Sequence, residues 1–263
     1  MSNSTPLVSI YITTFNRCLL LERALNSVLS QTYTNTEILI VDDASTDGTK
    51  EYIDKHFNDS RIQYFLLPKN KGACHARNIG INHAKGEFIT GLDSDDTFET
   101  WHIHALVLQF NSARSFICTT YSNSQDTSGI FGPDDLIWDN IAGNQFFALR
   151  SRVKATLFDE CLESAQDLDI MLRLSLNFGV FEKFHNQSYV LDTSSSISRI
   201  STSNNKILGL RKFYFKHRIH MSNRQKFYWK ILLQKWQMRR FTIFFNTLLS
   251  ILRPQKLLKK FSL

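Results

Sequence analysis

Short apolar runs alternate with amphipathic segments through the first hundred positions of the chain. Four runs, rich in β-branched residues, have the composition of strands buried on both faces. They cover residues 7–15, 37–41, 61–67 and 87–92. The segments between them place apolar residues at helical spacing. They cover residues 19–31, 49–57 and 73–84. Strands that alternate with helices in this way predict a parallel, doubly wound, Rossmann-like α/β sheet.

The pattern becomes less regular after residue 113. We expect two further strands, at 114–121 and 145–151, and an amphipathic helix at 167–178. A link rich in Ser, Thr and Asn follows at 194–205. A loop rich in Gly, Pro and Asp at 126–135 separates the two strands.

Charge divides the 263 residues into two unlike parts. The formal net charge is +7, but residues 1–192 contain all 24 acidic residues and only 15 of the 31 Lys and Arg. Residues 193–263 contain the other 16 Lys and Arg and no acidic residue. An apolar share of 43% excludes whole-chain disorder. We therefore predict an α/β body over residues 1–195 and a basic, aromatic, helical extension over residues 196–263.

The basic extension mixes cations with aromatic residues. Helices with Lys or Arg on one face and Trp, Phe or Leu on the other suit an anionic membrane surface, and this is the interpretation we favour. Packing of the helices on the body, with solvated cations, is the main alternative. Nucleic-acid binding is a third interpretation, and we expect no nucleic-acid partner. The longest apolar stretch, 241–252, is shorter than the roughly 20 residues that cross a bilayer.

Cysteine usage and the N-terminus indicate the compartment. The four cysteines are far apart and form no Cys-x-x-Cys, so neither a zinc ribbon nor a dithiol centre is indicated. Scattered thiols are typical of a reducing compartment. Residues 1–6 have neither the basic nor the apolar region of a signal peptide. We therefore expect a cytoplasmic protein.

Polar side chains stand at the ends of three predicted strands, where ligands bind in parallel sheets. They are Thr13 and Thr14, Asp42 and Asp43, and Asp93 and Asp95. Two carboxylates at a strand end can share Mg²⁺ or Mn²⁺. A second Asp-x-Asp lies at 167–169, and a short motif of this kind also arises by chance, so the strand-end position favours the first pair. No Gly-x-Gly-x-x-Gly follows the first strand, which disfavours a dinucleotide enzyme.

Seven motifs follow one another in order between residues 7 and 180. They cover residues 8–17, 27–32, 40–49, 70–80, 85–96, 158–160 and 166–174. As an ordered set they resemble the family 2 glycosyltransferases of the GT-A fold. The resemblance implies a nucleotide-sugar half at about 1–100 and an acceptor half at about 101–195.

The activity implied by this resemblance is inverting transfer of a hexose from a UDP-sugar to a glycan acceptor, with Mn²⁺ or Mg²⁺ as cofactor. Many bacterial relatives act on lipid-linked glycans, so the resemblance also implies a peripheral position on the cytoplasmic face of the inner membrane. O-antigen, capsule or lipopolysaccharide biosynthesis would be the setting. A catalytically silent module of the same fold, which binds a nucleotide-sugar or a glycan, is the alternative.

The resemblance also assigns roles to individual residues. It implies that Phe15 stacks on the pyrimidine, that Asp42 bonds the uracil edge and that Asp95 binds the metal. The full set is Thr13, Phe15, Asp42, Arg77 and Asp93 for the donor, and Asp95 with Asp93 for the metal. The metal would neutralise charge that develops on the leaving UDP.

Asp167 matches the general base of the family, which takes the proton from the acceptor hydroxyl. Asp169 is its competitor, but two residues along a helix it would point to a different face. Two departures from the family pattern support the silent alternative. Gln166 stands where many relatives have Glu, and no His stands near the 196–198 stretch, where Asp192 could substitute.

Overall fold

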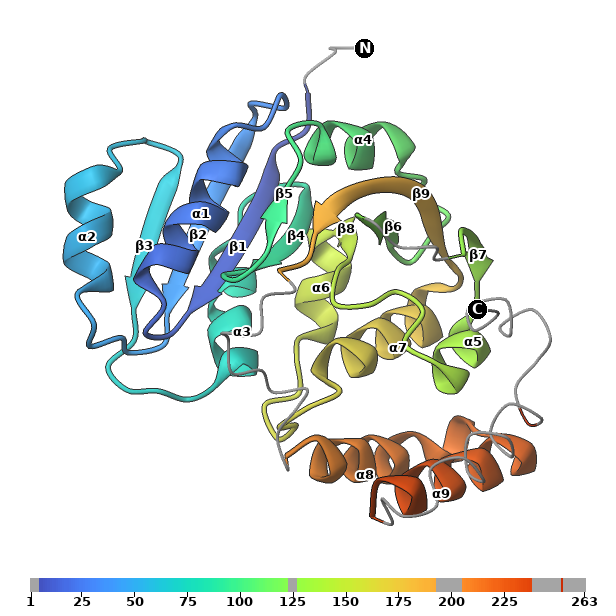
Figure 1. Ribbon diagram of the computed structural model, residues 1–263. Helices are drawn as coiled ribbons and strands as arrows, with labels where there is room; N and C mark the ends of the chain where they lie inside the picture. Colours follow the sequence, from blue (N-terminus) through green and yellow to red (C-terminus); the bar gives the residue numbers. More distant parts are fainter. Residues whose placement is uncertain (1–4, 123–126, 193–204, 238–251, 253–263) are drawn as a thin grey trace.

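A mixed sheet of nine strands forms the centre of the computed structural model, which describes residues 5–122, 127–192, 205–237 and 252 (Figure 1). The strands adjoin in the order β3-β2-β1-β4-β8-β6-β9-β5, and β7 pairs with β9. Their bounds are Val8–Thr14 (β1), Thr36–Asp42 (β2), Ile62–Leu66 (β3), Phe88–Asp93 (β4), Thr97–Phe98 (β5), Ile117–Tyr121 (β6), Gly129–Phe131 (β7), Phe147–Leu149 (β8) and Phe181–Val190 (β9).

Helices cover both faces of this sheet (Figure 1). Their bounds are Cys18–Leu29 (α1), Thr49–His56 (α2), Ala73–His83 (α3), His102–Gln109 (α4), Pro133–Trp138 (α5), Arg150–Thr156 (α6), Gln166–Phe178 (α7), Asn205–His217 (α8) and Asn223–Gln237 (α9), with a 3-10 turn η2 at Arg218–His220. The strands β1 to β4 are mutually parallel, so the doubly wound half predicted from the sequence is confirmed.

Alternation along the central strands divides the core in two. Ile10 and Ile12 face one hydrophobic cluster with α1, α2 and α4, whereas Tyr11 between them faces a second cluster with α3, α6 and α7. Period-two alternation of side chains is the cause. Because both faces are covered, the strands contain apolar residues almost throughout, and every residue of β2 is buried.

The second half of the sheet differs from the prediction. The strand expected at 145–151 is only the three residues of β8, antiparallel to β4, and the chain then turns into α6. The ten-residue strand β9 was not expected, because Glu182, Lys183 and His185 interrupt its apolar pattern. Pairing with β6 on one side and β7 on the other compensates for this polarity, and Lys183 donates to the carbonyl of Ile141 at 2.8 Å.

The basic extension packs on the body through α8 and α9, which lie beyond α7 on the side away from the sheet (Figure 1). Phe213, Tyr228 and Trp229 are buried in the second cluster, and the indole of Trp229 donates to the carbonyl of Ile137 at 2.7 Å. The packing alternative is therefore confirmed for the inner faces of these helices. The predicted link at 194–205 falls mostly outside the described residues. Within the described chain, no helix has the length and apolar character needed to cross a membrane.

Candidate active site

A cleft of about 790 Å³ opens at the carboxyl ends of β1 and β4 and runs to the extension. Parallel strands present their carboxyl ends at one edge, which is where this fold class binds ligands. One end of the cleft is polar, and the other is bounded by Trp138, Leu210 and Leu232. Of the residues predicted from the sequence, Thr13, Phe15, Arg77, Asp93, Asp95 and Asp167 line the cleft.

Three carboxylates lie close together at the end of β4 and in the turn that follows it. One oxygen from each of Asp93, Asp95 and Asp96 lies within 4.8 Å of the others. Asn144 holds two of them, since its amide donates to Asp93 at 2.9 Å and to Asp96 at 3.3 Å. Tyr189 donates to Asp96 at 3.0 Å. Burial, together with the charges of Asp93 and Asp95, raises the pKa of Asp96 to about 7.

Two arginines of the α1 region bracket Asp95. The guanidinium of Arg17 lies 3.4 Å from the Asp95 carboxylate. Arg23 donates to the backbone carbonyl of Asp95 and, at 2.5 Å, to the carboxylate of Asp192. The backbone N–H of Asp192 in turn donates to Asp96 at 2.9 Å. Asp192 therefore lies beside the acidic cluster with its carboxylate engaged by Arg23.

Arg77 connects the acidic cluster to the start of α7. Its guanidinium donates to Asp93 at 2.9 Å and to the side-chain oxygen of Gln166 at 2.9 Å. The same group lies 3.6 Å from the carboxylate of Asp167. The ring of Phe158 supports it from a distance of 5.1 Å. This buried cation balances two acids that the sequence places about 70 residues apart.

Asp167 stands in the first turn of α7, which begins after Ala165 in a left-handed conformation with φ of 59°. Burial raises the pKa of Asp167 to about 6, the charge of Arg77 opposes this rise, and the charge of Asp93 adds to it. A carboxylate with a pKa near neutrality is suited to accept a proton at physiological pH.

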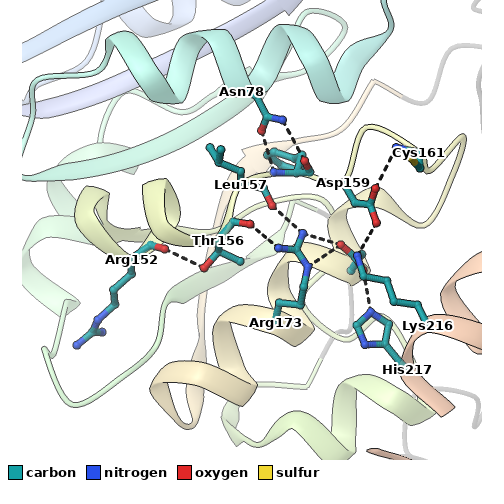
Figure 2. A network of polar contacts seen from close by, with 11 residues as sticks. Asn78, Arg152, Thr156, Leu157, Asp159, Cys161, Arg173, Lys216 and His217 are labelled. Carbon is teal, nitrogen blue, oxygen red and sulfur yellow. Dashed lines mark hydrogen bonds and ion pairs between the residues drawn. The ribbon is translucent and has the colours of Figure 1, made fainter. Parts of the chain in front are cut away.

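Asp169 does not line the cleft, although it is only two residues further on. Figure 2 shows Arg173, Lys216 and His217, which gather around Asp169. Its fully buried carboxylate accepts hydrogen bonds from Arg173 at 2.6 Å and from His217 at 2.7 Å, and pairs with Lys216 at 2.8 Å. Burial alone would raise the pKa of Asp169, but the His217 hydrogen bond and these cations lower it to about 2. Asp169 therefore joins α7 to α8.

The end of β1 offers a polar and an aromatic group to the cleft. Phe15 is 44% exposed, and Thr13 and Thr14 lie beside it. Within the described part of the chain, the buried hydroxyl of Thr14 has no hydrogen-bond partner. A buried hydroxyl on the wall of a cleft without a partner is unusual, and it favours a ligand at this end.

Asp42 and Asp43 have different positions. Asp42 is fully buried and does not line the cleft, and its carboxylate accepts hydrogen bonds from the backbone of Ser45 at 2.7 Å and from the hydroxyl of Tyr64. Asp43 lines the cleft and accepts from the backbone of Lys71 and Gly72 at 2.8 and 2.7 Å. Because side chains alternate along a strand, only one of two adjacent acids can face the ligand.

Sequence reasoning did not assign Asn144, Arg17 and Tyr189 to the site. Asn144 lies in an irregular loop with no periodic signal, and Tyr189 belongs to the strand that was not expected. Arg17 lies two residues after Phe15 within the first motif, and this proximity was the available signal.

A cleft at the carboxyl ends of a parallel sheet, with an acidic cluster at one point and a separate, partly exposed carboxylate joined to it by an arginine, is typical of α/β proteins that bind a nucleotide and a divalent metal. Comparison with known proteins makes the class specific. The family described as Glycosyl transferase family 2 matches residues 9–163, more than half of the chain. The chain belongs to glycosyl transferase family 2.

Two relatives show the extent of the likeness. The WcaA protein of Escherichia coli (strain K12), whose name assigns it to colanic acid biosynthesis as a glycosyl transferase, is 36% identical over 265 residues. That match covers 95% of this chain and 94% of WcaA. Hyaluronan synthase of Pasteurella multocida is 33% identical over 186 residues, 66% of this chain but only 19% of the synthase.

Solved structures confirm the predicted GT-A fold. TarS 1-349 of S. aureus, in complex with UDP-GlcNAc, superposes with a TM-score of 0.67 at 19% identity and covers 95% of this chain and 76% of that one. The mannosyltransferase PcManGT of Pyrobaculum calidifontis, in complex with GDP-Man and Mn²⁺, gives 0.63 at 16% identity, with 95% and 80% covered.

Proposed function

We propose that the chain is an inverting, metal-dependent glycosyltransferase that moves a hexose from a UDP-sugar to a glycan acceptor of a bacterial surface polysaccharide. The observation that carries the proposal is the position of Arg77, which holds Asp93 of the acidic cluster and lies 3.6 Å from Asp167 in one cleft. Inverting transfer needs a donor site and a separate base on the acceptor side, and this arrangement supplies both.

The donor nucleotide binds at the end of β1. The exposed ring of Phe15 offers a stacking surface for the pyrimidine, and Thr13 lies beside it on the wall of the cleft. We expect Asp43 to bond the uracil edge in place of Asp42, because Asp43 lines the cleft and the Asp42 carboxylate is buried away from it. Arg77 and Asp93 contact the donor further along the cleft.

The acidic cluster suits Mn²⁺ or Mg²⁺. Hard cations prefer carboxylate oxygens, and Asp93, Asp95 and Asp96 bring three within 4.8 Å of one another. Asp95, with Asp93, would hold the ion. When bound, the metal neutralises charge on the diphosphate leaving group. Arg17, 3.4 Å from Asp95, adds a fixed positive charge on the same side of the cleft.

Asp167 takes the proton of the acceptor hydroxyl as that oxygen attacks the sugar. A pKa of about 6 leaves the carboxylate ionised at neutral pH yet basic enough to accept a proton. The presence of Gln166, where many relatives have Glu, leaves Asp167 in place as the proposed base. Gln166 accepts a hydrogen bond from Arg77 and donates to the carbonyl of Leu162 at 2.9 Å, so it contributes to holding the turn in which Asp167 stands.

The acceptor approaches from the apolar end of the cleft, between α5 and the extension. The WcaA and TuaG relatives are named for colanic acid and teichuronic acid biosynthesis, which supports a surface-polysaccharide acceptor. We infer that this acceptor is lipid-linked and that the protein works at the cytoplasmic face of the inner membrane. The apolar wall formed by Trp138, Leu210 and Leu232 supports an amphipathic acceptor.

The test is a screen of UDP-sugars for UDP release, with a lipid-linked acceptor extract, in the presence and absence of EDTA. We expect one donor to be consumed with the metal present and none after its removal. Asp167→Asn should abolish transfer and leave UDP binding intact, whereas Asp54→Asn, on the exposed surface of α2, should change neither. Donor binding without turnover across the panel would support the catalytically silent alternative instead.

A further inference from the structure

Three large apolar side chains lie exposed along one side of α8 and the turn that follows it. Leu208 is 46% exposed, Phe215 59% and Ile219 78%. A spacing of seven residues places Leu208 and Phe215 on one face of α8, and Ile219 follows in the 3-10 turn η2. Single exposed apolar residues need no explanation, but a row of them marks an interaction surface.

Cations flank this row on both sides. Arg211 and Arg218 are exposed and fall on one flank by helical spacing, and Lys212 falls on the other. The guanidinium of Arg218 lies over the ring of Phe215 at 5.4 Å. Residues 193–263 contain no acidic residue, but two acids of the body border this face, since Lys212 pairs with Glu163 at 2.5 Å and Lys216 with Asp159 at 2.6 Å. The net positive charge of the face therefore comes from Arg211 and Arg218. An apolar row between cations is the pattern of a helix that lies in a membrane interface.

The opposite face of α8 is fixed to the body, so the exposed face cannot turn inward. Phe213 and His217 are buried there, and the ring of His217 donates to Asp169 of α7 (Figure 2). Gly209 packs so closely on Ser164 that a Cβ atom would lie 2.6 Å from the Ser164 backbone. The exposed row is therefore a rigid feature of the enzyme.

We propose that this face, formed by Leu208, Phe215, Ile219, Arg211 and Arg218, is the surface on which the protein lies against an anionic phospholipid bilayer. The inference deepens the proposed function, on which it rests, by naming the residues that meet the lipid. A bilayer fits better than a second copy of the chain, because pairing two such faces would bring two basic extensions together. Each cation near an anionic leaflet contributes about 1 kcal/mol.

The position of this face has a consequence for the acceptor. Leu210 and Lys206 lie on the inner side of α8 and line the cleft. The same helix therefore borders the cleft on one side and the bilayer on the other. A lipid-linked acceptor could reach Asp167 from the membrane along α8 without leaving the interface.

The test measures binding of the full chain to vesicles of equal parts phosphatidylglycerol and phosphatidylcholine, with pure phosphatidylcholine vesicles for comparison. We expect binding to the anionic vesicles only. The triple variant Leu208→Ser, Phe215→Ser and Ile219→Ser should bind at least about tenfold more weakly, because each apolar side chain buried in the interface contributes. The double variant Arg211→Gln and Arg218→Gln should bind the anionic vesicles about tenfold or more weakly than wild type. Its binding should also depend much less on salt concentration.

The matched control is Leu108→Ser, which removes a side chain that is 75% exposed on α4 of the body and should bind as wild type does. The proposal is overturned if the triple variant binds the anionic vesicles as tightly as wild type does. It is also overturned if wild type binds neither kind of vesicle. Self-association that the triple variant abolishes, without vesicle binding, would assign the face to a second copy. UDP binding by wild type, measured without vesicles, tests the proposed function separately from the membrane-binding face. If wild type binds no UDP, the proposed function is refuted, and the vesicle result still stands.

Discussion

The guanidinium of Arg77 lies 3.6 Å from the carboxylate of Asp167, and the same group donates to Asp93 at 2.9 Å. One buried cation therefore contacts both Asp93 in the acidic cluster and Asp167 at the start of α7. We expect the diphosphate of the proposed donor to compete for Arg77, which would change the electrostatic environment of Asp167 when the donor is bound. Such competition would couple donor binding at the acidic cluster to the pKa of Asp167.

The pH profile should report Asp167. Burial raises the pKa of this carboxyl to about 6, and only the ionised form can accept the acceptor proton. We expect kcat/KM for transfer to be constant above about pH 6 and to fall about tenfold per pH unit below it. Steady-state transfer from pH 5 to 8, in overlapping buffers, measures this limb. An acid limb near the ordinary Asp value would mean that Asp167 is not the base.

Removing the charge of Arg77 should shift the acid limb of the pH profile for transfer. Because Arg77 lowers the pKa of Asp167 against the effect of burial, Arg77→Gln should shift the acid limb upward. We also expect transfer at pH 7 to fall at least about tenfold, since a charge aimed at the donor is lost. Arg114→Gln, which removes a cation paired with Glu182 at 3.3 Å outside the cleft, is the matched control. A downward shift in Arg77→Gln would contradict the electrostatic argument.

The nucleotide half could be predicted from the sequence because local signals and tertiary structure agree there. The first four strands are continuous apolar runs, and polar residues at their ends fall on one edge for topological reasons alone. Phe15, Asp93 and Asp95 therefore reach the cleft as expected. Asp42 does not, because which of two adjacent acids faces the ligand depends on the pleat of β2 and on Tyr64.

The second half could not be predicted in the same way, because its contacts are set by packing between distant segments. Nothing local marks Asn144, which contacts Asp93 across 51 residues. The polar strand β9 is stabilised by pairing with β6 and β7. The helical spacing of 167 and 169 did predict that these two acids face different ways, and a partner of Asp169 proved to be His217 of α8, which is 48 residues further along the chain.

Metal binding should depend on Asp95. Asp95→Asn removes one of three carboxylates that lie within 4.8 Å of one another, and we expect the affinity for Mn²⁺ in the presence of UDP to fall about tenfold or more. Calorimetric titration of Mn²⁺ into the UDP complex measures this directly. Asp54→Asn controls for the loss of an acid elsewhere. If Asp95→Asn binds Mn²⁺ as tightly as wild type, the metal is held elsewhere.

Low pH should weaken the contacts through which Asp169 links α7 to α8. The folded protein lowers the pKa of Asp169 to about 2, below its unfolded value. The associated stabilisation, about 2 kcal/mol, is therefore full above about pH 4 and is lost as the pH falls toward 2. At pH 7, Asp169→Asn should lower the free energy of unfolding by about 3 kcal/mol, because it removes the buried anion with which Arg173 and Lys216 pair. Urea denaturation of Asp169→Asn and of Asp159→Asn, whose carboxylate is partly exposed, should show a smaller loss in the second variant.

Gly209 sets how closely α8 can approach the turn that carries the base. A Cβ atom at this position would lie 2.3 Å from the Ser164 hydroxyl oxygen and 2.6 Å from the Ser164 backbone nitrogen and oxygen, and a backbone contact of this kind cannot be relieved by rotating a side chain. Ser164 precedes Ala165 and the first turn of α7, so displacement of α8 must disturb the placement of Asp167.

Gly209→Ala should therefore lower both stability and transfer. Alanine favours a helix by about 1 kcal/mol over glycine, but overpacking against backbone costs about 1–3 kcal/mol, so the net effect is destabilising. The matched control is Gly132→Ala, where a Cβ atom meets nothing within 4 Å. Thermal denaturation and UDP release under saturating donor compare the two. If Gly209→Ala is as stable and active as Gly132→Ala, α8 can move away from Ser164 without affecting the base.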